Sequence, residues 1–251
     1  MPKFFIKNNQ INNNCITITG EDVKHIVNVL RIKIGENIQV CNTDTSDNYI
    51  VKLDNVQKEK IECEIQSKIE SEAESDVSIN IFQGIPKSDK MELIIQKSTE
   101  LGVKQITPVQ MERCVSKISG KDELKKIDRW QKISEVAAKQ SGRDIIPKIN
   151  AVVRISDLCN KAKDYDMLIV PYEREEEHSL KNAIEELKLI NNPKLSIGIV
   201  IGPEGGFEVS EIERLKSSGA KIITLGKRIL RTETVAIAMA SVIMYELGGN
   251  I

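Results

Sequence analysis

Residues 195–207, LSIGIVIGPEGGF, decide the fold because an apolar run leads directly into a glycine-rich turn. The run 195–201 predicts a strand. Three glycines among positions 202–206 permit positive φ angles and the close approach of a ligand. A helix is expected over 210–218, with Ser210 and Glu213 at capping-box spacing. A strand, a glycine loop and a helix in succession could hold a phosphate group. The loop lacks the GxxxxGKS/T and GxGxxG patterns of known phosphate sites, however, so a plain turn is also possible.

A second segment repeats this arrangement at residues 225–234, LGKRILRTET. It follows an expected strand over 221–225 and precedes an expected helix over 234–247. Its Ile-Leu pair suggests apolar walls around a flat group, with Arg231 and Glu233 nearby, while Thr232 or Thr234 is a candidate helix cap. Ligands of parallel sheets bind where strands end, so both segments are expected at one edge of a sheet.

The region after residue 76 alternates strands and helices, which predicts an α/β domain with a mainly parallel sheet. Asp89 and Glu92 stand at capping-box spacing. A third loop at a strand end is Pro171, Tyr172 and Glu173, where a solvent-facing turn fits equally well. Further strands are expected over 77–83, 105–109, 148–153 and 167–171, and further helices over 89–101, 122–141 and 179–189.

The first 70 residues are expected to form a small β-barrel. One amphipathic helix fits residues 21–30, and the polar, acidic stretch 71–76 is the best linker candidate. The predicted organisation is a domain over 1–70, a linker over 71–76 and a domain over 77–251. Strands of the barrel are expected over 4–6, 15–18, 37–41, 49–53 and 61–65.

Composition excludes several classes of protein. Apolar residues make up 40% and charged residues 29%, and no apolar run is long enough to span a membrane, so a cytoplasmic protein is expected. The five cysteines form no CxxC pair, and the two histidines lie far apart, so we expect neither a disulfide framework nor a metal site. The net charge is −1, but residues 112–148 hold 10 basic and 6 acidic residues. This stretch fits either a solvated helix face or a phosphate-backbone contact.

GPEGGF followed by LGxxILRTET resembles the signature of the SPOUT superfamily of RNA methyltransferases, and in detail that of the RsmE family. That family methylates N3 of a uridine in the 16S RNA of the small ribosomal subunit. The similarity runs from end to end, and its combined pattern is highly specific. It also includes His25 with residues 29–31, Lys87 with residues 90–92, residues 96–103, Pro108, Arg113, residues 140–141, Arg143 and Pro147.

The resemblance implies an N-terminal PUA-like barrel that helps to bind RNA and a C-terminal domain with a deep trefoil knot. It also implies a homodimer, 16S ribosomal RNA or the small subunit as partner, and S-adenosylmethionine as cofactor. General topology rules do not predict a knot, because knots are almost absent among folds. The residues expected to bind the cofactor are Pro171, Tyr172, Glu173, Ile201, Gly202, Pro203, Gly205, Gly206, Leu225, Gly226, Ile229 and Leu230.

Methylation at N3 requires that the base be unpaired, because N3 lies on its Watson–Crick edge and carries a proton. Arg231 is expected to stabilise the anionic uracil oxygens, and Glu204 or Glu233 is expected either to accept the proton or to orient a neighbour. Cys114 departs from the serine expected after Arg113, which puts a hydroxyl contact to RNA in doubt. The residues expected to contact RNA are Arg31, Lys87, Arg113, Gln140 and Arg143.

Three alternatives stay open on the sequence. A non-catalytic RNA-binding protein explains the barrel and the basic stretch but leaves the glycine loops without a purpose. A nucleotide-dependent enzyme explains a glycine loop before a helix, although the Walker lysine is missing. A methyltransferase of the same fold that acts on another RNA also fits.

Overall fold

The computed structural model describes residues 1–70, 73–118 and 120–248, and the chain divides into two compact units. The first comprises Met1–Glu74 with Ala138–Ile146, and the second comprises Ser75–Ala137 with Pro147–Ile251. The chain passes from one unit to the other inside the expected linker, of which residues 71 and 72 lie outside the described residues. Segment 138–146, which we placed in the C-terminal domain, belongs by its contacts to the first unit.

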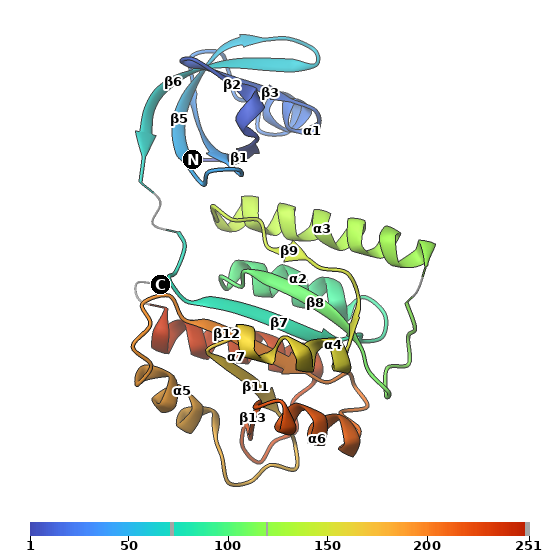
Figure 1. The fold of residues 1–251 in the computed structure, drawn as a ribbon. Helices are drawn as coiled ribbons and strands as arrows, with labels where there is room; N and C mark the ends of the chain where they lie inside the picture. Colours follow the sequence, from blue (N-terminus) through green and yellow to red (C-terminus); the bar gives the residue numbers. More distant parts are fainter. Residues whose placement is uncertain (71–72, 119, 249–251) are drawn as a thin grey trace. The chain divides into compact units, whose positions relative to one another are not determined.

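The first unit contains a curled sheet whose alternating side chains enclose a small core, as the resemblance to a PUA-like barrel implies (Figure 1). The sheet comprises β1 (Lys3–Ile6), β2 (Ile11–Asn12), β3 (Cys15–Thr19), β4 (Asn37–Asn42), β5 (Asn48–Val56) and β6 (Lys60–Ile69), in the order β1-β4-β5-β6-β3-β2. Ile16 and Ile18 alternate toward the core from β3. The expected helix is present as α1 (Glu21–Lys24), which continues into the π-helical turn η2 (His25–Val29).

Segment 138–146 is held to the first unit by buried charges. The Arg143 side chain bonds Glu74 through Nε at 2.9 Å and Nη2 at 2.7 Å, and Arg143 is only 3% exposed. The Lys3 ammonium pairs with Asp144 in the same unit. Arg143 was expected to contact RNA, but its guanidinium is buried and already holds a carboxylate. We therefore remove Arg143 from the candidate RNA contacts.

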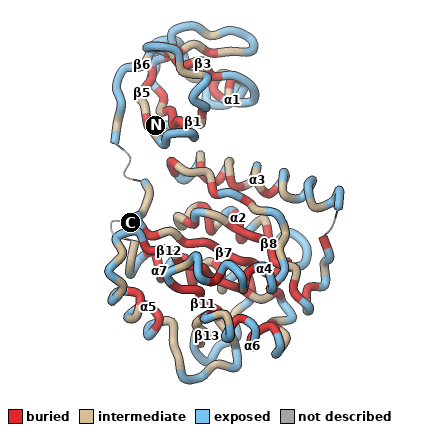
Figure 2. Tube along the Cα trace, in the orientation of Figure 1, coloured by how far each residue is buried: buried red, intermediate tan, exposed pale blue. Residues whose placement is uncertain are grey.

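The second unit is built on a sheet in which all strand pairs are parallel. Its strands are β7 (Ser78–Gly84), β8 (Gln105–Gln110), β9 (Lys148–Ile149), β10 (Val153–Arg154), β11 (Met167–Pro171), β12 (Ser196–Ile201) and β13 (Lys221–Ile223). The order is β10-β8-β7-β12-β11-β13, with β9 beside β8. The central strands β7 and β12 are almost entirely buried because parallel strands are covered on both faces (Figure 2).

Helices cover both faces of this sheet. They are α2 (Lys90–Glu100), α3 (Lys121–Ser141), α4 (Ile155–Asn160), α5 (Leu180–Lys188), α6 (Val209–Ser217) and α7 (Thr232–Leu247), with the 3-10 turn η3 (Ala162–Asp164). The helices α2 and α7 pack together on one face, and α4 and α6 pack together on the other (Figure 1). The predicted α/β class with a parallel sheet and a small N-terminal barrel is confirmed.

Several local predictions were wrong in detail. The strand expected over 148–153 is split into β9 and β10, and α4 was not foreseen. Asp89 makes no side-chain cap bond to α2, and the Glu92 side chain pairs with Arg129 at 2.7 Å. The cap expected at Ser210 lies two residues earlier, where the Glu208 backbone N–H donates to Glu211 at 2.9 Å.

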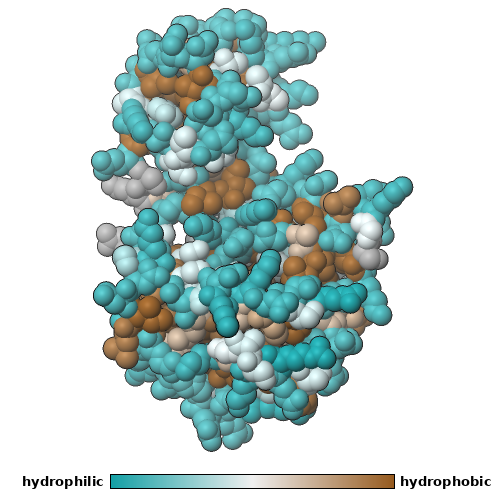
Figure 3. Space-filling view, viewed as in Figure 1, coloured by the Kyte–Doolittle hydropathy of each residue, from teal (hydrophilic) through white to brown (hydrophobic). Residues whose placement is uncertain are grey.

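The face shown in Figure 3 is largely hydrophilic, with scattered apolar patches. Among the helices of the described chain, none combines the length and the apolar character needed to cross a bilayer. The large apolar side chains gather instead in two cores, one in each unit.

The chain returns from the edge of the sheet to its centre before the last helix begins. β13 lies at the edge beside β11, whereas α7 contacts β12 and α2. This return path brings the first turn of α7 against the loop that follows β12. The deep trefoil knot implied by the resemblance stays a prediction.

Candidate active site

Three loops leave the carboxyl ends of neighbouring strands. The glycine loop (residues 202–206) follows β12, the tyrosine loop (residues 171–173) ends β11, and the arginine loop (residues 225–231) follows β13. β12, β11 and β13 are adjacent and parallel, so the three loops share one edge of the sheet. The expected placement of the two glycine segments at one edge is confirmed.

The glycine and tyrosine loops pack against each other. The rings of Tyr172 and Phe207 meet edge to face, with centroids 6.3 Å apart. Gly206 has a φ of +69°, and a β-carbon there would lie 3.2 Å from Glu173 Oε1. The positive φ and this close approach explain why the turn takes glycine.

Arg113 lies in the segment that follows β8, and its side chain holds the glycine loop in place. Its Nε donates to Glu208 Oε1 at 2.8 Å, and its Nη1 donates to the carbonyl oxygen of Gly205 at 3.1 Å. The hydrogen bond with Glu208 raises the pKa of the guanidinium further. Arg113 was expected to contact RNA; in the structure its hydrogen bonds go to the protein, and they fix the position of Gly205.

The first turn of α7 is fastened to the glycine loop by a buried hydrogen-bond chain. Gln83 Nε2 donates to Thr232 Oγ1 at 2.8 Å, and Thr232 Oγ1 donates to the carbonyl oxygen of Gly202 at 2.7 Å. Gln83 is fully buried and Thr232 is 5% exposed. Thr232 therefore does not cap the helix, and its hydroxyl instead joins three segments that are distant in sequence.

Replacing Thr232 by valine is expected to lower the free energy of unfolding by about 1–3 kcal/mol, because the change leaves the Gly202 carbonyl and one Gln83 N–H without partners. Thr234→Val is the matched control, since Thr234 lies in the same turn but is exposed. Denaturant unfolding of both variants measures the difference. Equal midpoints for Thr232→Val and Thr234→Val would contradict the role given to the buried hydroxyl.

Lys90 lies between the two glutamates that were candidates for the general base. Its Nζ is 3.1 Å from Glu204 Oε1 and 3.4 Å from Glu233 Oε2. The Lys87 backbone N–H also donates to Glu204, at 3.1 Å. Burial raises the pKa of Glu204, but backbone hydrogen bonds and Lys90 outweigh it, so the net shift is downward. The backbone hydrogen bonds and the ion pair with Lys90 therefore favour the ionised form of Glu204.

The arginine loop is the exposed wall of the site. Gly226 has a φ of +97°, and no atom lies within 4 Å of the position that a β-carbon would take. Leu225 packs against the core and Leu230 is half-buried, whereas Ile229 is 88% exposed. Ile229 and Leu230 were both expected to form an apolar wall of the site, but of these two side chains only that of Leu230 is partly buried. Arg231 is exposed, and no carboxylate of the described chain pairs with it.

The remaining candidate RNA contacts are exposed. Lys87 lies beside the glycine loop in the second unit, and Arg31, with a φ of +54°, and Gln140 belong to the first unit. Cys114 is buried, its Sγ lies 3.3 Å from the Met111 nitrogen, and burial raises the pKa of its thiol. Because this thiol does not face solvent, the expected effect of Cys114 on an RNA contact is not supported.

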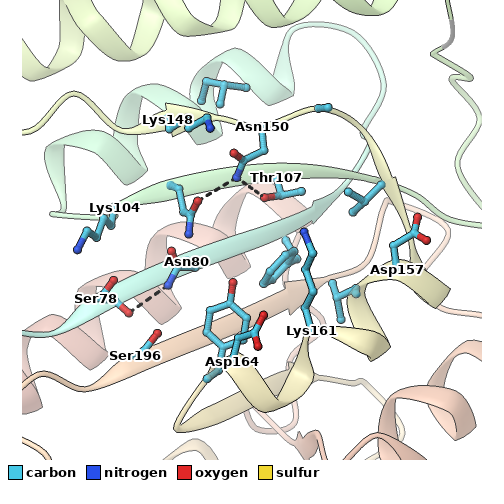
Figure 4. A pocket seen from close by; sticks show the side chains of 17 residues that line it. Ser78, Asn80, Lys104, Thr107, Lys148, Asn150, Asp157, Lys161, Asp164 and Ser196 are labelled. Atoms are coloured by element: carbon cyan, nitrogen blue, oxygen red, sulfur yellow. Dashed lines mark hydrogen bonds between the residues drawn. The ribbon is translucent and has the colours of Figure 1, made fainter.

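A polar pocket of about 670 Å³ lies elsewhere on the second unit, over the face of the sheet that carries α4 (Figure 4). Asn150 Nδ2 donates there to Gln105 at 3.0 Å and to Thr107 at 2.8 Å, and Lys161 reaches across the pocket. None of the residues predicted for the active site lines it. No pattern in the sequence predicts this pocket, because its lining comes from scattered short segments.

Comparison with known proteins agrees with this architecture. Residues 73–244 match the family model described as an RNA methyltransferase domain, and residues 18–66 match an RNA methyltransferase PUA domain. The ribosomal RNA small subunit methyltransferase E of Bacillus subtilis (strain 168) is 36% identical over 92% of this chain and 90% of its own length. The enzyme of that name from Mesomycoplasma hyopneumoniae (strain 232) is 37% identical over 94% of this chain and 96% of its own.

A solved structure extends the likeness to the fold. It is a ribosomal RNA small subunit methyltransferase E from Neisseria gonorrhoeae bound to S-adenosyl methionine. It is 31% identical, covers 98% of this chain and 97% of its own, and superposes with a TM-score of 0.84. Sequence, domain order and fold agree over nearly the whole length, and the chain therefore belongs to the RsmE family of ribosomal RNA small subunit methyltransferases.

Proposed function

We propose that this chain transfers a methyl group from S-adenosylmethionine to N3 of a uridine in 16S ribosomal RNA. The observation that carries the proposal is the convergence of three loops at one sheet edge, with an exposed arginine beside them. The membership in the RsmE family supports ribosomal RNA as the substrate.

The glycine, tyrosine and arginine loops are proposed to hold the cofactor, which supplies an electrophilic methyl group when it is bound. The fit rests on the glycines: Gly226 leaves open space beside its backbone, and Gly206 allows the turn to pass close to Glu173. Tyr172 and Leu230 add partly apolar walls for a flat adenine ring.

Arg231 is proposed to stabilise the negative charge that develops on the uracil oxygens when N3 loses its proton. The new N3–carbon bond then forms as the sulfur–carbon bond breaks, and the N3 proton passes to solvent. Glu204 and Glu233 were both candidates to accept this proton, but Lys90 pairs with both. We assign these two glutamates the orienting role instead.

The first unit is proposed to bind RNA through its PUA-like sheet, with Arg31 and Gln140 among its exposed polar groups. A homodimer is proposed as the assembly, as the family resemblance implies. Val242 and Tyr245 of α7 support it, since both apolar side chains are exposed, Tyr245 by 79%.

A strain that lacks the gene tests the proposed function. Mass spectrometry of its small-subunit RNA is expected to show the loss of one methyluridine, and restoration of the gene is expected to return it. Mapping of the lost mark then gives the nucleotide. Unchanged methylation of the 16S RNA, with the loss of a mark in another RNA, would favour a methyltransferase of the same fold with a different substrate.

A further inference from the structure

Three segments that are distant in sequence meet at one ammonium group. Lys90 lies in the first turn of α2, Glu204 lies in the glycine loop, and Glu233 lies in the first turn of α7. Lys90 Nζ is 3.1 Å from Glu204 and 3.4 Å from Glu233. The site described above is built from two of these segments, so Lys90 can act on the site without touching substrate.

We propose that Lys90 is a positioning residue whose single positive charge offsets the repulsion between Glu204 and Glu233, and so lets the glycine loop lie against the start of α7. The inference rests on the proposed function. It assigns to this lysine a role in the geometry of the cofactor loops, apart from the cofactor contacts and from Arg231.

The charge balance makes Lys90 necessary. Two carboxylates that share one cation are close neighbours, and without the cation they would repel each other. Glu233 Oε2 is buried and makes no hydrogen bond to the described residues, so Lys90 is the group that compensates its charge. The cluster is half-buried, and removing its only cation is costly because it leaves uncompensated charge behind at Glu233, the least exposed of the three side chains.

A pair within the same helix, α2, provides the comparison. Lys97 pairs with Glu100 at 2.8 Å, three residues along α2, and joins no other segment. Pairs between neighbouring positions of one helix contribute little to stability. Lys90 differs because its partners come from the glycine loop and from α7, and because the Glu233 side chain is only 14% exposed.

The test compares the full-length protein with four variants: Lys90→Met, Lys90→Arg, the double variant Lys90→Met with Glu233→Gln, and the control Lys97→Met. One readout is the dissociation constant for S-adenosylmethionine, measured by calorimetry. The other needs no cofactor: it is hydrogen exchange at the Gly206 N–H, which donates to the Pro203 carbonyl at 2.9 Å. Thermal unfolding verifies that each variant is folded.

Lys90→Met is expected to weaken cofactor binding by about tenfold or more and to speed exchange at Gly206, since unpaired like charges push the loop away. The double variant is expected to recover most of both losses because it removes the repulsion. Lys90→Arg and Lys97→Met are expected to behave like the unchanged protein.

A double variant as impaired as Lys90→Met would overturn the proposal, because Lys90 would then act by direct contact and not through the glutamates. Unchanged exchange at Gly206 in Lys90→Met would overturn it as well. Hydrogen exchange at Gly206 tests this inference separately from the proposed function. If the unchanged protein binds no S-adenosylmethionine, the proposed function is wrong, but the exchange rate at Gly206 still decides the role of Lys90.

Discussion

Arg231→Ala is expected to reduce methyl transfer by about 10²–10³-fold while S-adenosylmethionine still binds, because a single charged donor to a developing anion contributes on this scale. Arg231 stands just before α7 with an extended backbone, at φ −68° and ψ 150°. The next residue, Thr232, is anchored to Gly202, so the backbone at Arg231 is held in place. The helix amino terminus adds a favourable field for a negative charge beside the arginine.

Arg228→Ala is the matched control for this prediction. Arg228 carries the same charge in the same exposed loop, three residues before Arg231. Single-turnover assays with saturating cofactor separate methyl transfer from binding, and calorimetry verifies the cofactor affinity. Near-normal turnover in Arg231→Ala, or an equal loss in Arg228→Ala, would contradict a specific role for Arg231.

Gly84→Ala is expected to weaken S-adenosylmethionine binding by at least about tenfold and to lower the melting temperature, because overpacking of this kind typically costs 1–3 kcal/mol. A β-carbon at Gly84 would lie 2.7 Å from both the nitrogen and Cδ of Pro203. Real contacts of this kind are not that short, and part of the conflict is with backbone atoms. The glycine loop must therefore shift away from the end of β7.

Calorimetry with S-adenosylmethionine and thermal unfolding measure the two effects of Gly84→Ala. The melting temperature measures the cost of the overpacking at residue 84. The affinity for S-adenosylmethionine shows whether the displaced glycine loop alters the cofactor site. If the melting temperature falls and the affinity is unchanged, the glycine loop does not form the cofactor pocket. This outcome would contradict the proposed site while leaving the fold as described.

The sequence predicted the fold class well because the strands that build it are strongly patterned. The run 195–201 is a buried central strand, and the alternation at Ile16 and Ile18 belongs to the core of the first unit. The glycine pattern also located the loops correctly, since glycines directly after a strand indicate a turn at the sheet edge. The short, weakly patterned elements were missed, among them α4 and the division of β9 from β10.

The ion pairs could not be predicted from the sequence, because they join residues that are far apart in the chain. From the sequence, Glu204 and Glu233 were candidates either for the general base or for an orienting group, and the structure places Lys90 between them. Arg143 was expected to contact RNA from a loop, yet its side chain is buried and pairs with Glu74, which is 69 residues away in the sequence. Periodicity shows which face of an element is buried, but it does not show which side chain meets which across the fold.

The most direct test of the proposed activity uses the purified protein, S-adenosylmethionine labelled in its methyl group, and small subunits or 16S RNA from a strain that lacks the gene. After digestion of the RNA to nucleosides, the label is expected in 3-methyluridine, and substrate that already carries the mark is expected to accept none. Label in another nucleoside, or no transfer to either substrate by a protein that binds the cofactor, would contradict the account.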